Sequence, residues 1–342
     1  MPNLRLPRRA LLAGAGALLA APRVARADTV DLRVSFSVNY DGSTAPFFLG
    51  VQRGYYASVG LRCRFDGAGG SVESIGRVGA GVYDFGIGDI NVLTGFDASN
   101  PDKAISAVFM LYYRSPLSAI TFARSGIAKP ADLAGKTLGA AVNDAAYRLF
   151  PAFCKINGLD PNAVKWKFVD LRLREALLLR GDVDAILGFD STSYFNLIKG
   201  GAKREDIKLV YYSDWGMPLY GNAVVASRKM LDDADLTKRF LIASAKSYQA
   251  AIADPAAAIA ALQQQESLID VALETERLTW LIRNQLVTAE SKAGGLGVVD
   301  AARLAAAIAV VKDGFGLPVA PPPDTLFNAA FMPPDDTRKI PV

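Results

Sequence analysis

The sequence predicts an α/β protein that contains two related β-α-β-α-β units and a final block of helices. First, residues 81–89 (GVYDFGIGD) and 181–190 (GDVDAILGFD) share a pattern: a glycine, an aspartate three residues later, an apolar run and a second glycine close to an acid. Second, the elements before these segments match in order and length. Third, residues 232–316 are rich in alanine and indicate consecutive helices. A strand that follows a helix and a glycine turn, twice, is typical of an α/β protein.

Each unit has the order strand, helix, strand, helix, followed by the strand after the glycine turn. In the first unit we expect these elements at residues 32–41, 44–59, 62–65 and 71–80. In the second unit we expect them at residues 136–144, 145–157, 164–169 and 172–180. Gly60 and Gly158 would end the first helix of each unit, because glycine adopts positive φ without a Cβ penalty. Ligands of open α/β sheets bind beyond the carboxyl ends of the strands, so two facing units would enclose a cleft.

Two segments indicate where the chain passes between the units. Residues 104–123 and 211–227 each consist of two apolar stretches with a polar interruption, which is Arg114-Ser115-Pro116 in the first. Two crossings make a hinge. We therefore expect a two-lobed protein. Lobe 1 would consist of residues 28–116 and 222–342, with the helices at 232–316 packed on it, and lobe 2 of residues 117–221.

The first 27 residues resemble an export signal. Arg8-Arg9 precedes an apolar run at residues 10–21 that is too short to span a bilayer, and Ala25-Arg26-Ala27 supplies small residues for cleavage. Either the twin-arginine or the general secretory route fits, and both predict a periplasmic protein. The formal charge of +4 includes five arginines of this segment, so the remaining chain is close to neutral. We expect no nucleic-acid binding and a monomer.

The chain contains 0 histidines, which limits its chemistry. Ser-His-Asp hydrolysis, Cys-His proteolysis and histidine-ligated metal sites are excluded, and no phosphate-binding glycine loop is present. We expect Cys63 and Cys154 to be buried free thiols, because a disulfide between the two units would obstruct the hinge. The sequence therefore favours binding over catalysis, with no cofactor and no metal.

Three loops at strand or helix ends are candidates for ligand contact on their residues alone. Asn39-Tyr40-Asp41 follows the first strand, although these residues also suit a plain turn. Gly70-Ser71 precedes a helix whose free N–H groups could bind a polar ligand, and Ser71 could equally be its N-cap. Asp89 could accept hydrogen bonds from a ligand amine or cap the next helix.

Several strings, in this order, resemble the solute-binding proteins of ABC importers. The nearest branch includes binders of nitrate, alkanesulfonates and the pyrimidine precursors of thiamine. The resemblance covers about residues 30–331 and is carried by APFFLGVQRGYYASVGL, GGS, GVYDFGIGD, RSPLSAI, ADLAGKTLG, GDVDAILGF and YSDWGMPLYGN. It implies the type II periplasmic binding fold, in which two α/β lobes joined by two crossover strands close on a ligand. It also implies two partners, a membrane permease and its ATPase.

The resemblance places ligand contacts in loops that hold one cation, Arg114, and five aspartates. The residues of these loops are Asn39, Tyr40, Asp41, Gly70, Ser71, Asp89, Arg114, Ser115, Asn143, Asp144, Phe189, Asp190, Ser191, Asp214 and Trp215. An anion would be repelled there, so we expect an amine-bearing or aromatic heterocycle, similar to a thiamine pyrimidine precursor. The alternatives are an alkanesulfonate or nitrate receptor, a ligand-sensing subunit, and a dehydratase or lyase that uses Asp89 or Asp190 as its base.

Overall fold

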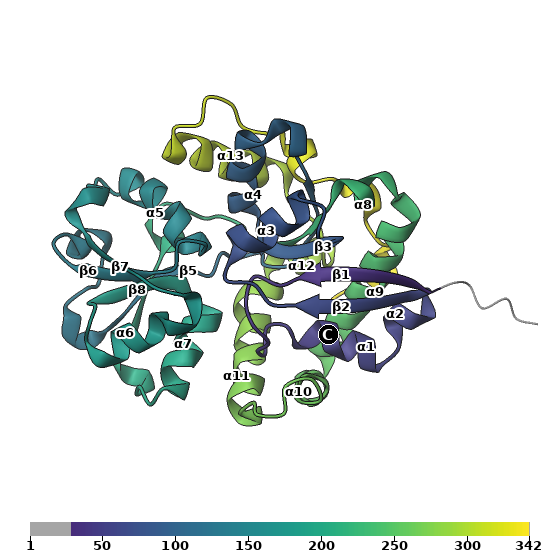
Figure 1. The fold of residues 1–342 in the computed structure, drawn as a ribbon, viewed down its shortest axis with the longest axis horizontal. Helices are drawn as coiled ribbons and strands as arrows, with labels where there is room; N and C mark the ends of the chain where they lie inside the picture. The colour runs from purple at the N-terminus through teal and green to yellow at the C-terminus, as the bar shows by residue number, and fades with distance from the viewer. Residues whose placement is uncertain (1–28, 342) are drawn as a thin grey trace, which may run out of the picture.

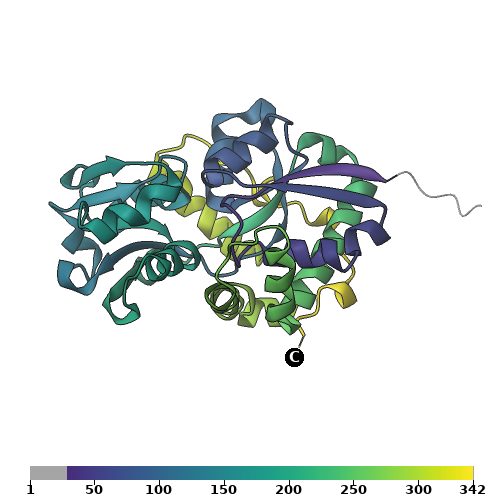
Figure 2. The same cartoon turned by 60° about the horizontal axis from the view of Figure 1, so that its bottom comes forward.

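The computed structural model describes residues 29–341, and the proposed export signal at residues 1–27 lies outside them. Two five-stranded sheets lie side by side, each covered by helices (Figures 1 and 2). We call the sheet β2-β1-β3-β10-β4 with its helices the first lobe, and the sheet β7-β6-β8-β5-β9 with α5–α7 the second lobe. None of the helices in this part of the chain is both long and apolar enough to cross a membrane.

The two sheets have the same topology. The first contains β1 (Val30–Ser35), β2 (Leu61–Asp66), β3 (Phe85–Asp89), β4 (Ser106–Met110) and β10 (Asn222–Ala226). The second contains β5 (Leu117–Phe122), β6 (Thr137–Ala140), β7 (Lys165–Phe168), β8 (Ala185–Phe189) and β9 (Ile207–Tyr211). In each sheet four strands run parallel and one, β10 or β5, runs antiparallel between the third and the fourth of them. The chain reaches this antiparallel strand by crossing between the lobes.

Helices cover both sheets, and most C-terminal helices complete the first lobe. Those of the two repeated units are α1 (Ala45–Gln52), α2 (Tyr55–Ser58), α3 (Ser71–Gly79), α4 (Ile90–Ser99), α5 (Ala145–Ile156), α6 (Arg174–Arg180) and α7 (Asp190–Lys199). The later ones are α8 (Arg228–Asp232), α9 (Ala234–Ala253), α10 (Pro255–Gln263), α11 (Val271–Leu281), α12 (Ala289–Gly294), α13 (Ala301–Phe315) and α14 (Pro323–Leu326). A π-helical turn, Ile282–Leu286, continues α11. Helices α9 and α10 pack on α1, as predicted, whereas α13 also contacts α5 of the second lobe (Figure 1).

The internal repeat predicted from the two glycine-aspartate segments is present, and the structure explains the aspartate. Asp84 Oδ2 accepts a hydrogen bond from the Arg33 N–H at 2.8 Å, and Asp184 Oδ2 accepts one from the Thr137 N–H at 2.7 Å. In return, the Asp84 N–H donates to the Arg33 carbonyl, and the Asp184 N–H donates to the Thr137 carbonyl. The aspartate therefore joins the last strand of each unit to its first strand.

The expected helix at residues 44–59 is divided into α1 and α2. Gly54 adopts a left-handed conformation with φ 70°, which breaks the helix between them. The first strands of both units are also shorter than expected, because β1 ends at Ser35 and β6 at Ala140. The polar residues that follow therefore belong to loops at the carboxyl ends of the sheets.

The two crossover segments contact each other between the lobes. The Gly221 N–H donates to the Tyr112 carbonyl at 2.9 Å, and the Ser115 N–H donates to the Leu219 carbonyl at 3.2 Å. A continuous apolar core also runs from α4 through α5 to α13. Within the described chain Cys63 and Cys154 are free thiols. Cys154 is buried as expected, but Cys63 is only half-buried because β2 is an edge strand.

We predict that Asp184→Ala destabilises the protein by about 1–3 kcal/mol, because it leaves the Thr137 N–H without its acceptor. Asp182→Ala is the matched control, since Asp182 forms only an exposed ion pair with Arg180, which contributes under about 1 kcal/mol. Urea denaturation measures both free energies of unfolding. Equal values for the two variants would contradict the structural role of Asp184.

Candidate functional site

The lobes contact each other at Gly70, where both sheets present the carboxyl ends of their parallel strands. The Val72 N–H donates to the Asn143 carbonyl of the second lobe at 3.2 Å. Gly70 has φ 135°, and a Cβ on it would lie 2.2 Å from the Asn143 oxygen. Both the backbone conformation and the close approach require glycine. Gly70 and Asn143, two predicted site residues, therefore form one boundary of a cleft between the lobes.

The cleft has a deep part and a mouth. Seven of the residues that line the deep part are Ser37, Gly70, Ser71, Asp144, Arg174, Phe189 and Thr192. Its free volume is about 10 Å³, close to the space that a single water requires. The mouth has a volume of about 140 Å³, lies between Asn39 and residues 67–69 of the first lobe and residues 170–172 of the second, and is mainly polar. Side chains of the two lobes thus fill the deep cleft almost completely.

A buried arginine, Arg174, occupies the second-lobe wall of the cleft. Its guanidinium donates to Asp144 Oδ2 at 2.5 Å and to Glu175 Oε1 at 2.8 Å. Gly188 makes this position possible, because a Cβ there would lie 2.7 Å from the Arg174 Cζ. Asp144 also caps α5 by accepting from the Ala146 N–H at 2.7 Å. Two carboxylates and one guanidinium leave this wall with an excess of negative charge.

Asp190 is enclosed by donors from both lobes. It accepts hydrogen bonds from the Tyr211 hydroxyl at 2.8 Å, from Trp280 Nε1 at 3.0 Å and from Gln285 Nε2 at 3.0 Å. Trp280 and Gln285 belong to α11 and to its π-helical continuation in the first lobe. Burial raises the pKa of Asp190, and these three donors oppose that shift. The carboxylate therefore ties the start of α7 to the first lobe.

Arg277 on α11 forms a second connection to the start of α7. Its guanidinium donates to the carbonyl oxygens of Ser191 at 2.8 Å and Thr192 at 3.1 Å. Within the first lobe it pairs with Glu274 at 2.7 Å and lies 3.4 Å from Asp41 Oδ2. Asp41 and Ser191, both predicted to contact ligand, thus belong to the contact between the lobes.

Three buried acceptor atoms near the cleft have no hydrogen-bond donor among residues 29–341: Asp89 Oδ2, Asn222 Oδ1 and Gln285 Oε1. Asp89 and Asn222 are paired across β3 and β10, and Ser71 Oγ accepts from the Asp89 N–H at 3.2 Å. The other Asp89 oxygen caps α4 by accepting from the Asn91 N–H at 2.9 Å, as one of our alternatives held. Burial raises the pKa of Asp89 to about 6. Ser71 is not an N-cap, since Gly70 has that position.

The remaining predicted site residues lie outside the deep cleft. Tyr40 packs on Phe48, with ring centroids 4.9 Å apart, and donates to the Phe65 carbonyl. The others lie at the crossover segments: Arg114 and Asp214 form a half-exposed ion pair at 3.4 Å, Ser115 is buried, and Trp215 is 37% exposed. Arg114, Ser115 and Asp214 connect the crossovers to each other, whereas the Trp215 carbonyl accepts from the Asn157 side chain at the end of α5.

Sequence reasoning did not identify Arg174, Arg277, Trp280 or Gln285. The sequence predicts a helix at residues 172–180 and helices packed on the first lobe at residues 232–316, and it assigns no role to these four side chains. One signal was available in the repeat: in the register set by Gly81 and Gly181, the charged pair Arg174-Glu175 of the second unit aligns with Ser74-Ile75 of the first. A charged residue in place of an apolar one marks a position where packing is not the only role.

The architecture is the periplasmic binding protein fold, as solved structures with the same arrangement confirm. An alkanesulfonate-binding protein from Xanthomonas axonopodis pv. citri, bound to MOPS, is 16% identical with a TM-score of 0.66 and covers 88% of this chain and 99% of its own. A ligand-binding component of an ABC-type import system from Staphylococcus aureus is 11% identical with a TM-score of 0.65. The match covers 88% of this chain and 97% of that protein. A Candida albicans protein described as having the generic periplasmic binding protein fold is 17% identical with a TM-score of 0.64. The match covers 92% of this chain and 98% of that protein.

The sequence itself matches the profile of one family, described as NMT1/THI5 like, over residues 42–258. This match covers more than half of the chain, and the protein belongs to that family. No curated protein sequence matches the chain. The resemblance inferred from the sequence motifs is confirmed at the level of family and fold.

We predict that the stability of the wild-type protein relative to Asp89→Asn falls as the pH rises from about 4 to about 6. The pKa of Asp89 is raised from 3.8 to about 6, so the folded state binds this proton more tightly than the unfolded chain does. Each unit of pKa shift corresponds to about 1.4 kcal/mol, and asparagine retains the cap without a charge. Thermal unfolding at pH 4.5 and 7.5 measures the difference. A constant difference between the two proteins would show that Asp89 titrates normally.

Proposed function

We propose that this protein is the solute-binding component of an ABC importer and that it captures a small amine-bearing or aromatic heterocycle, similar to a thiamine pyrimidine precursor. The main support is the set of buried acceptors at the carboxyl end of the first sheet, Asp89 Oδ2, Asn222 Oδ1 and Gln285 Oε1. An unpaired buried acceptor costs about 1–3 kcal/mol, which a ligand N–H would recover. A ligand that donates hydrogen bonds fits these groups, and an anion does not.

Charge supports the same class of ligand. Each buried arginine of the interface is paired with two carboxylates, whereas Asp89 and Asp190 have no arginine or lysine partner in the described chain. The interface between the lobes therefore has an excess of negative charge, which favours a cation or a group with N–H donors. The Phe189 ring lines the deep cleft and offers a face for an aromatic ligand.

Binding would proceed through separation and closure of the lobes. The 10 Å³ of free volume does not admit a heterocycle, so the ligand enters when the lobes separate. It then favours closure by the contacts that it makes only with both lobes together. The permease and its ATPase would receive the closed receptor. An export signal at residues 1–27 and a periplasmic monomer complete this proposal.

A receptor for an alkanesulfonate is the second candidate. Arg174 is a buried guanidinium at the cleft wall and could bind a sulfonate after it exchanges partners with Asp144. The similarity to an alkanesulfonate-binding structure agrees with this alternative. We favour a receptor over an enzyme, because Asp190, one of the two candidate bases, already accepts from Tyr211, Trp280 and Gln285.

A panel of aminopyrimidines, other N-heterocycles, alkanesulfonates, nitrate and small amines tests the proposal by thermal unfolding of residues 28–342. We expect a stabilisation of several degrees with the nitrogenous heterocycles alone, since a ligand at a hundred times its Kd contributes about 2.7 kcal/mol. A response limited to sulfonates or nitrate would contradict the assigned ligand class. If no compound of the panel stabilised the protein, the proposal that it is a receptor for these classes of ligand would be contradicted.

For the heterocycle that binds, Asp89→Asn should weaken binding by about tenfold or more, because a hydrogen bond to a charged group is worth about 1.5–3 kcal/mol. Asp97→Asn is the matched control. Asp97 lies inside α4 and, like Asp89, has a buried unpartnered oxygen, but its other oxygen accepts from the Ile105 N–H, just before β4. Isothermal titration calorimetry measures both. Similar affinities for the two variants would remove Asp89 from the site.

A further inference from the structure

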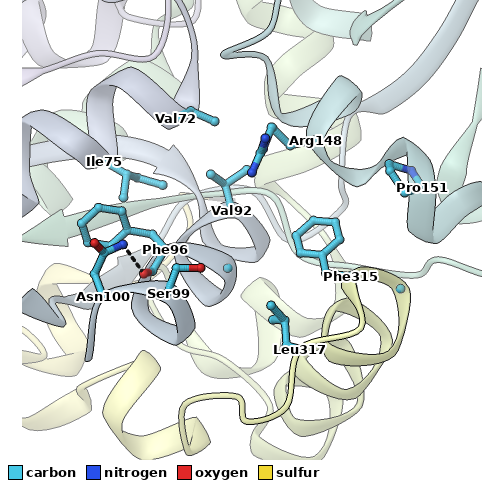
Figure 3. Close-up of a pocket in the computed structure, with 12 residues that line it drawn as sticks. Val72, Ile75, Val92, Phe96, Ser99, Asn100, Arg148, Pro151, Phe315 and Leu317 are labelled. Atoms are coloured by element: carbon cyan, nitrogen blue, oxygen red, sulfur yellow. Dashed lines mark hydrogen bonds between the residues drawn. The ribbon is translucent and has the colours of Figure 1, made fainter. Parts of the chain in front are cut away.

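A second cavity, of about 490 Å³, lies outside the cleft, between α3, α4, α5 and the end of α13 (Figure 3). Its volume is within the range of about 300–1,000 Å³ that small-molecule sites occupy. Most of its wall is apolar and comes from Val72, Ile75, Val92, Phe96, Phe315 and Leu317. The backbone contact between Val72 and Asn143 separates it from the deep cleft.

Arg148 on α5 is the only charged residue among the twelve that line this cavity. Its guanidinium points into the cavity, toward Val92 (Figure 3). Across residues 29–341 it lies within ion-pair distance of no carboxylate. An arginine fork matches the two oxygens of a carboxylate, so the cavity combines an apolar body with a site for one anionic group.

The wall at α13 is fixed by close contacts with both lobes. A Cβ on Gly314 would lie 2.1 Å from the Ala152 Cβ, which shows how closely α13 approaches α5. Lys155 Nζ donates to Asp313 Oδ1 at 2.8 Å across the same contact. A Cβ on Gly95 of α4 would lie 3.2 Å from the Phe315 ring. The Phe315 ring is thus held between the two lobes at the edge of the cavity.

We propose that this cavity is a second ligand site, which binds a small monocarboxylate with an apolar body and pairs its carboxylate with Arg148. Phe96 and Phe315 contact the apolar body. Because α5 belongs to the second lobe and α3 and α4 to the first, an occupant links the lobes in the arrangement described above. This site is separate from the deep cleft, and its proposal does not rest on the ligand class assigned to that cleft.

Isothermal titration calorimetry with 4-phenylbutyrate and the uncharged 4-phenylbutan-1-ol tests the proposal. The two probes share their apolar body, so the difference in affinity reports the carboxylate. We expect 4-phenylbutyrate to bind at least about tenfold more tightly than the alcohol, and Arg148→Gln to remove this preference. Arg148→Lys retains the charge and should retain part of the preference.

Two further variants locate the binding. Ser99 is exposed and lines the cavity, so Ser99→Trp should fill it and weaken both probes without loss of folding. Arg180→Gln is the control for a lost surface arginine and should bind like the wild type. Equal affinity for the two probes, an unchanged preference in Arg148→Gln, or unchanged binding in Ser99→Trp would each overturn the proposal. Circular dichroism confirms that each variant is folded.

Discussion

The arrangement of the lobes depends on the burial of one carboxylate, Asp190, between them. A carboxylate removed from water must be hydrogen-bonded, and two of its donors, Trp280 and Gln285, belong to the first lobe. Arg277 adds donors to the carbonyl groups of the same helix start. These contacts connect the C-terminal helices to the second lobe, and they exist only while the lobes are close together.

The same contacts explain how such a receptor would open and close. When the lobes separate, water can solvate Asp190 and Arg277, so the loss of the hydrogen bonds that each makes to the other lobe is partly compensated. Unpartnered acceptors such as Asp89 Oδ2 make closure without a donor less favourable. A ligand that supplies N–H groups would shift this balance toward closure. The opposing terms leave the equilibrium between the two arrangements sensitive to a small molecule.

Much of the fold could be predicted from the sequence, because its signals are local. Glycines at helix ends, apolar strands and the repeated aspartate define the two units, and loops at strand ends then place Gly70, Ser71, Asp144 and Phe189 at the cleft. The partners of these residues could not be predicted. Arg277 and Trp280 lie inside a helix and are hydrogen-bonded to residues distant in sequence, and nothing local distinguishes them from packing residues. The repeat marks Arg174 as charged, but it does not show that its partner is Asp144, 30 residues away. Tyr40 shows the opposite error: its place in a strand-end loop predicts a ligand contact, but its ring packs on Phe48 in the first lobe.

Small-angle X-ray scattering of Asp190→Ala tests most directly whether this carboxylate holds the lobes together. Its removal leaves Trp280 Nε1 and Gln285 Nε2 without an acceptor, and separation of the lobes exposes both groups to water. The account predicts a larger radius of gyration than that of the wild type. Asp214→Ala, which removes only a half-exposed ion pair at the crossovers, should leave the radius unchanged. Superimposable scattering curves for Asp190→Ala and the wild type would contradict the account.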